Sequence, residues 1–133
     1  MRRILFVCML MLVAVGTQAQ AYQSPVAFIP EQAMVGKKLT VTYNTELTEL
    51  KGARAVDMVA YFWHDYRWTA IDAPMIKSGN LWMSVIDIPT DAALLTLKFV
   101  ADDKVDIGGR NTYSQFTVDS LGRNLPSSYL GWG

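Results

Sequence analysis

The chain has 133 residues, of which 51% are hydrophobic, and its 12 basic residues balance its 12 acidic residues. This size and composition are typical of one domain with one hydrophobic core. Because a nucleic-acid-binding protein needs a basic stripe to neutralise phosphates, the balanced charge predicts that nucleic acid is not a partner.

The first 21 residues have the pattern of a cleavable signal peptide. Arg2 and Arg3 provide a positive start, and residues 4–15 form an apolar run that is too short to cross a bilayer. Ala19 and Ala21 form a small-x-small cleavage site before Tyr22. We therefore expect an exported protein, periplasmic or extracellular, without stable insertion in a membrane.

Signal cleavage also removes the only cysteine, Cys8. Cys8 lies inside the apolar run rather than at the cleavage boundary, which argues against a lipid anchor. The mature chain then has 112 residues, 10 basic and 12 acidic, and no thiol. Since disulfides are excluded, its stability must come from burial of apolar surface.

Short β-branched and aromatic runs follow the signal, each bounded by Gly, Pro, Asn or Asp. They predict seven strands, at residues 26–29, 38–43, 56–63, 67–71, 81–88, 94–101 and 113–118. Residues 46–54 are predicted to form a loop, because Gly52 and the lack of helix caps disfavour a helical turn.

Several of these strands alternate apolar and polar residues. Leu39, Val41 and Tyr43 share one face of their strand, which is the pattern of a half-buried strand. Without helices between the strands, the pattern predicts two antiparallel sheets packed face to face. We expect an all-β, immunoglobulin-like sandwich of about seven strands over residues 22–121. Residues 122–133 would form a C-terminal tail or the start of a linker to a missing domain.

The residues needed for catalysis or cofactor binding are scarce. His64 is the sole histidine, its neighbour Asp65 is poorly placed to orient it, and no Gly-x-Ser-x-Gly elbow occurs. One histidine without cysteine does not make a zinc site, and no glycine-rich nucleotide motif is present. We therefore predict a protein that is not an enzyme and uses no cofactor or metal.

One acidic segment leaves a metal alternative open. Asp102, Asp103 and Asp106, followed by Gly108 and Gly109, have the oxygen-rich pattern of a calcium loop. The segment lacks the spacing and the closing glutamate of an EF-hand. A solvated hairpin connection is favoured, because Asp and Gly tolerate the backbone angles of tight turns.

An aromatic cluster is the main candidate for a binding surface. Val56, Met58, Ala60 and Phe62 form an apolar face that should point into the core. The opposite face then carries aromatic side chains that can stack on sugars or anchor a protein interface. The candidate ligand or partner residues are Tyr61, Trp63, Tyr66, Trp68 and Trp132. The alternative is that several of them fill gaps between the sheets, as we expect for Trp82.

Several segments occur in the order of a known domain: residues 36–44, Tyr66-Arg67-Trp68 with Met75 and Trp82 after it, residues 99–109, and the tail from Gly122 to Gly133. The chain resembles the amino-terminal immunoglobulin-like β-sandwich of exported bacterial thioredoxin-family proteins. The resemblance implies a non-catalytic accessory module, truncated or encoded separately, whose partner is a neighbouring redox domain or an envelope protein. Redox activity is not implied, because no Cys-x-x-Cys pair is present.

A weaker similarity links the chain to starch-type carbohydrate-binding modules. It depends on the aromatic strand, a later tryptophan and a hairpin in which Asp106, Gly109 and Tyr113 match loosely. This similarity implies an alternative function, the binding of an α-glucan by the exposed aromatic side chains.

Overall fold

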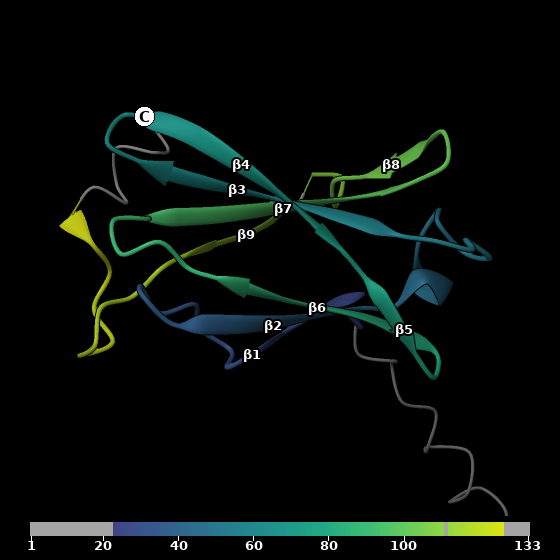
Figure 1. Ribbon diagram of the computed structural model, residues 1–133, viewed down its shortest axis with the longest axis horizontal. Helices are drawn as coiled ribbons and strands as arrows, with labels where there is room; N and C mark the ends of the chain where they lie inside the picture. Colours follow the sequence, from purple (N-terminus) through teal and green to yellow (C-terminus); the bar gives the residue numbers. More distant parts are fainter. Residues whose placement is uncertain (1–22, 111, 127–133) are drawn as a thin grey trace, which may run out of the picture.

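The computed structural model describes residues 23–110 and 112–126. The predicted signal peptide and Trp132 lie outside these residues. The described chain is built from two antiparallel β-sheets stacked face to face, as Figure 1 shows. The prediction of an all-β fold with two antiparallel sheets is therefore confirmed.

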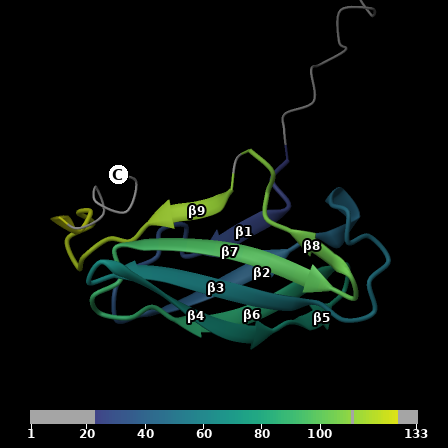
Figure 2. The same cartoon turned by 90° about the horizontal axis from the view of Figure 1, so that it is seen from above.

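Nine strands make up the two sheets in the described part of the chain. Sheet I has the order β1-β2-β6-β5, with β1 at Val26–Ile29, β2 at Lys38–Tyr43, β6 at Leu81–Asp87 and β5 at Ile76–Ser78. Sheet II has the order β4-β3-β7-β8, with β4 at Arg67–Pro74, β3 at Asp57–His64, β7 at Leu94–Ala101 and β8 at Lys104–Asp106. Strand β9, Tyr113–Phe116, lies on the same edge of β7 as β8 (Figure 2). It pairs with the first half of β7, whereas β8 pairs with the second half.

The core lies between the sheets and is formed by alternate residues of the central strands. Strand β2 contributes Leu39, Val41 and Tyr43, all fully buried. Strand β3 contributes Met58, Ala60 and Phe62, as its alternation predicts, and Trp82 is buried as expected. Each large side chain buried in this way contributes roughly 1.5–3 kcal/mol. The described residues thus form an extensive apolar core.

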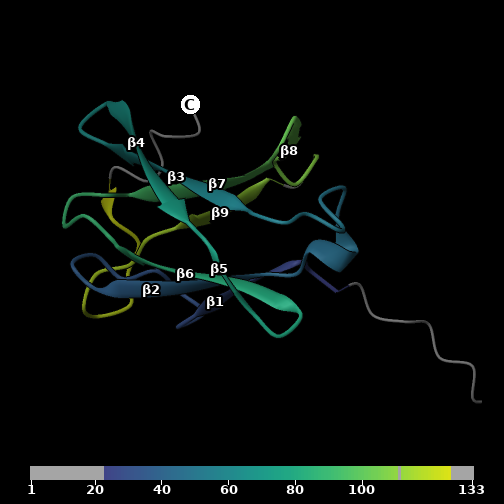
Figure 3. The ribbon, with the colours of Figure 1, turned by 45° about the vertical axis from the view of Figure 1, so that its right-hand side comes forward.

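Two segments join the sheets at their edges. The chain leaves β4 in sheet II and enters β5 in sheet I at Met75, whose amide donates to the Val56 carbonyl at 3.0 Å (Figure 3). The second segment lies between β1 and β2 of sheet I, where Met34 forms a parallel bridge with Val118, which follows β9 of sheet II. The Val35 amide donates to the Val118 carbonyl at 3.0 Å. These contacts fix the stacking of the two sheets.

The structure also corrects parts of the prediction. All seven expected strands exist, but β4 continues to Pro74, β9 ends at Phe116, and the two short strands β5 and β8 were missed. Residues Thr45–Leu47 form a 3-10 helix, η2, capped by Asn44, whose side chain accepts from the Glu46 amide at 3.1 Å. The expected lack of a cap was therefore wrong. Within residues 23–110 and 112–126, no helix is long and apolar enough to cross a bilayer.

Candidate functional site

Strand register brings four apolar residues into one row on the outside of sheet II. Trp63 on β3 lies opposite Trp68 on β4 and Leu94 on β7, and Leu94 lies opposite Phe116 on β9. Phe62 and Leu95 belong to the core, so their neighbours Trp63 and Leu94 face outward. Trp68 and Phe116 share that face, because they are the register partners of Trp63 and Leu94. Directly opposed side chains on one face are in contact range. We call Trp68, Trp63, Leu94 and Phe116 the outer row.

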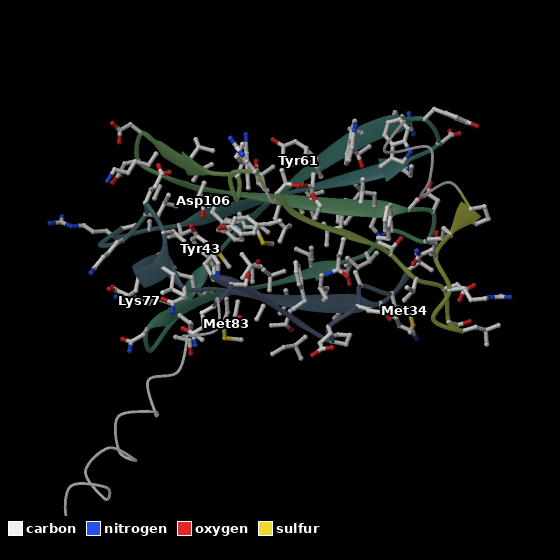
Figure 4. All side chains as sticks on the ribbon, turned by 180° about the vertical axis from the view of Figure 1, so that it is seen from behind. Met34, Tyr43, Tyr61, Lys77, Met83 and Asp106 are labelled. Atoms are coloured by element: carbon white, nitrogen blue, oxygen red, sulfur yellow. The ribbon has the colours of Figure 1, made fainter. Side chains whose placement is uncertain are left out.

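The aromatic side chains of this face form two kinds of contact. The rings of Trp63 and Trp68 lie with centroids 5.4 Å apart and planes tilted by 58°. Trp68 remains 45% exposed, whereas Trp63 is half-buried. Beside the row, the Tyr61 ring lies under the Lys98 ammonium, with Nζ 5.6 Å from the ring centroid. Figure 4 shows Tyr61 on the outer side of sheet II. This face combines an exposed indole with a cation–π pair.

Tyr66 lies apart from the row, at the tip of the β3–β4 hairpin. It is 75% exposed, and both Asp65 and Tyr66 have positive φ angles, 49° and 58°. A two-residue hairpin turn with two positive φ angles is usually occupied by Asn, Asp or Gly. Placing tyrosine there costs about 1–2 kcal/mol relative to an unstrained conformation. A strained position that displays an exposed aromatic ring is typical of functional surfaces.

Replacement of Tyr66 by glycine is expected to raise the free energy of unfolding by up to about 1 kcal/mol, because glycine adopts a positive φ without steric cost. Urea denaturation of the purified protein measures this change. Tyr66→Ala is the matched control, since alanine removes the ring but keeps the strain. A loss of stability in Tyr66→Gly would show that the ring makes contacts worth more than the strain it imposes.

His64 lies between a hydroxyl and a carboxylate. Its Nε2 is 2.9 Å from the Thr69 hydroxyl and its Nδ1 is 2.9 Å from Asp91 Oδ2. Hydrolase triads have the same order of groups, and here Asp91, not the sequence neighbour Asp65, supplies the carboxylate. However, Thr69 lies within a regular strand, whereas the nucleophile of an α/β-hydrolase lies on a sharp turn that exposes it. We therefore interpret the trio as a brace between the β3–β4 hairpin and the loop before β7.

Asp106 accepts three hydrogen bonds from within the protein. Its Oδ2 accepts from the Tyr43 hydroxyl at 2.6 Å and from the Tyr113 hydroxyl at 2.8 Å, and its Oδ1 accepts from the Gly108 amide at 2.9 Å. Tyr43 belongs to sheet I, whereas Tyr113 and Asp106 belong to sheet II. Figure 4 shows Tyr43 and Asp106 close together between the layers. The carboxylate therefore links the two sheets.

The environment of Tyr43 changes its chemistry. Burial raises the pKa of the phenol well above its ordinary value of 10.0, and the hydrogen bond to Asp106 raises the pKa further. The ring is stacked on Phe99, with centroids 3.8 Å apart and planes 2° from parallel. The phenol therefore stays protonated and donates to Asp106 at any physiological pH.

The calcium alternative gains no support from the geometry of its residues. Asp102 and Asp103 are exposed at the β7–β8 turn, and Asp106 is occupied by the hydrogen bonds described above. Across residues 23–110 and 112–126, no three His, Cys, Asp or Glu side chains lie close enough to hold a metal ion together. The three aspartates thus do not form one site.

Sequence reasoning found part of this arrangement. Tyr61 and Trp63 lie on the outer face as predicted from alternation, and Trp68 joins them through its register with Trp63. Tyr66 projects from the turn, and Trp132 is outside the described residues. The contributions of Leu94 and Phe116 were missed, because they depend on the register of β7 with its two neighbours. Comparisons with family models, curated proteins and solved structures give no match to this chain.

Proposed function

We propose that this protein is a non-catalytic, exported interaction module that binds a partner protein through the outer row. The observation that carries the proposal is the outer row itself, four apolar side chains on a sheet face with Trp68 at 45% exposure. Tryptophan and tyrosine are enriched at the energetic centres of protein interfaces. The neighbouring Lys98 and Tyr61 add polar groups at the rim, as an interface requires.

We also propose that the sandwich is of the immunoglobulin type. Its sheets have the orders β1-β2-β6-β5 and β4-β3-β7-β9. These correspond to strands A-B-E-D and C′-C-F-G of an immunoglobulin domain. The correspondence supports the sequence resemblance to the amino-terminal domain of exported thioredoxin-family proteins. On that basis the proposed partner is a neighbouring redox domain or an envelope protein.

The test uses photo-crosslinking from the mature chain in the envelope of the producing cell. A photoreactive phenylalanine at position 68 should capture the partner, whereas the same group at position 76 should not. Ile76 is the matched control because it is 75% exposed on the outside of sheet I. Position 76 thus presents an apolar side chain on the opposite face.

With the captured partner purified, Trp68→Ala is expected to weaken its binding at least tenfold, because an anchor residue contributes at least about 1.4 kcal/mol. Ile76→Ala should leave the dissociation constant unchanged. Isothermal titration calorimetry measures both. Equal capture from positions 68 and 76, or unchanged affinity in Trp68→Ala, contradicts the proposal.

Glycan binding is the second candidate, favoured by the exposed rings of Tyr66 and Trp68. Flat aromatic rings stack on sugar faces. The 58° tilt between Trp63 and Trp68 allows a sugar to stack on one indole but not on both. A fluorescence titration with soluble α-glucans separates the candidates, because only a glycan-binding surface gives a saturable change in tryptophan emission that disappears in Trp68→Ala.

A further inference from the structure

Strand β4 forms one edge of sheet II. All eight of its residues, Arg67–Pro74, pair with β3 in an unbroken register. In the part of the chain that the structure describes, the other edge of β4 pairs with no strand, and Figure 2 shows β4 along one side of the sheet. The unpaired edge of a strand presents backbone donors and acceptors that can pair with a further strand.

The backbone groups at this edge belong to alternate residues of β4. The Met75 amide donates to the Val56 carbonyl, and these two residues continue the register of β4 with β3. Because hydrogen-bonded residues alternate along an antiparallel pair, the odd-numbered residues of β4 bond to β3. The even-numbered residues turn their backbone groups to the edge, and they are Trp68, Ala70, Asp72 and Pro74. All of them are exposed.

The other edges of the two sheets are protected against pairing, whereas this edge is not. Natural proteins protect edges with short strands, prolines or charged side chains. Strand β1 has four residues and is followed by Pro30, and β5 has three residues, with Lys77 opposite the buried Trp82. The edge of β7 is divided between β8 and β9, which have three and four residues. Strand β4 has eight residues, no lysine, and a proline only at its last position.

The sequence of β4 fits a second copy of the same strand. Two antiparallel copies related by a two-fold axis at Ala70 place Ala70 opposite Ala70 and Trp68 opposite Asp72. The backbone donors and acceptors of these three residues then all have partners, and no like charges lie opposite one another. Ile71, which is 39% exposed, comes to lie opposite Thr69 and loses contact with water.

We propose that the protein forms a two-fold symmetric dimer in which the β4 strands of two copies pair antiparallel, through the backbone of Trp68, Ala70 and Asp72. This inference goes beyond the proposed function, because it concerns the edge of sheet II and not its outer face. The two copies of sheet II join into one continuous sheet, and the axis perpendicular to it keeps both outer rows on the same side. The dimer can therefore engage a partner at two sites at once.

Amide hydrogen exchange, followed by NMR at increasing concentrations of the purified protein, tests this pairing. Exchange at Trp68, Ala70 and Asp72 should slow as sedimentation equilibrium shows a dimer forming. The amides of Ile71 and Ala73, which bond to β3, should be protected at every concentration.

Three results would overturn the inference. In the first, the protein stays monomeric with fast exchange at the edge amides, which leaves the edge to a strand of a different protein. In the second, a dimer forms and the edge amides still exchange fast, so that the copies meet elsewhere. In the third, the edge amides are protected in a monomer, because the same chain covers them.

A charged variant at the axis tests the register. Ala70→Lys places two like charges opposite each other and should raise the dimer dissociation constant several-fold. Ala27→Lys is the matched control, because Ala27 is also an exposed alanine on an edge strand, β1 of sheet I, and this variant should dimerise like the wild type. Unchanged dimerisation in Ala70→Lys, or an equal loss in both variants, contradicts the proposal. The exchange measurement needs no substitution, so it decides the question even if Ala70→Lys does not fold.

Discussion

Asp106→Ala is expected to lower the free energy of unfolding by roughly 3 kcal/mol, because it removes the carboxylate that accepts from the Tyr43 and Tyr113 hydroxyls and from the Gly108 amide. The Tyr43 hydroxyl is fully buried, and besides Asp106 it lies 3.0 Å from the Thr48 hydroxyl. This loss of stability should be among the largest for replacement of a single polar side chain, because the acceptor is charged and its hydrogen bonds link the two sheets. Guanidinium chloride denaturation at neutral pH measures it.

Two further variants separate this explanation from a general effect of changing the hairpin. Asp103→Ala, at an exposed position of the same hairpin, should change stability by less than about 0.5 kcal/mol. The double variant Tyr43→Phe with Asp106→Ala should lose less than the sum of the single losses, because each single variant already removes the hydrogen bond between Tyr43 and Asp106. Additive losses would show that the two groups do not depend on one another.

The fold was largely predictable because the core strands have an unambiguous alternation. Strand β2, with Leu39, Val41 and Tyr43 inward, pairs in the structure over the residues that its sequence predicts. Strand β5 was not predictable, because all three of its residues are exposed and leave no pattern. Its position depends on the crossing at Met75 from one sheet to the other. A three-residue edge strand is specified by its neighbours rather than by its own sequence.

The candidate site was predictable only in part, because it depends on contacts between segments distant in sequence. The alternation in β3 places Tyr61 and Trp63 outward, but the row is completed by Leu94 and Phe116 from β7 and β9. Register between strands, rather than any local pattern, brings them together. In the same way, Asp106 looked like a metal ligand in the sequence because its partner Tyr43 is 63 residues away.

Alkaline solutions should destabilise the protein through Tyr43. Burial and the hydrogen bond to Asp106 raise the pKa of this phenol above 10.0, the value it returns to on unfolding. The stabilisation is therefore complete below about pH 10 and falls above it, because the unfolded chain releases a proton that the folded chain retains. The slope is about 1.4 kcal/mol per pH unit, so roughly 2 kcal/mol is lost by about pH 11.5.

Denaturation curves between about pH 9 and pH 11.5 measure this loss, and Tyr43→Phe identifies its source. The variant should be less stable than the wild type near neutral pH, since it lacks the hydrogen bond to Asp106. Above pH 10 its free energy of unfolding should then decrease less steeply than that of the wild type. The difference in slope should be about 1.4 kcal/mol per pH unit, which corresponds to one proton. Tyr66→Phe is the control, because it makes the same chemical change at a side chain that is 75% exposed. Parallel curves for the wild type and Tyr43→Phe would contradict the assignment, because the steep decrease would then come from another group.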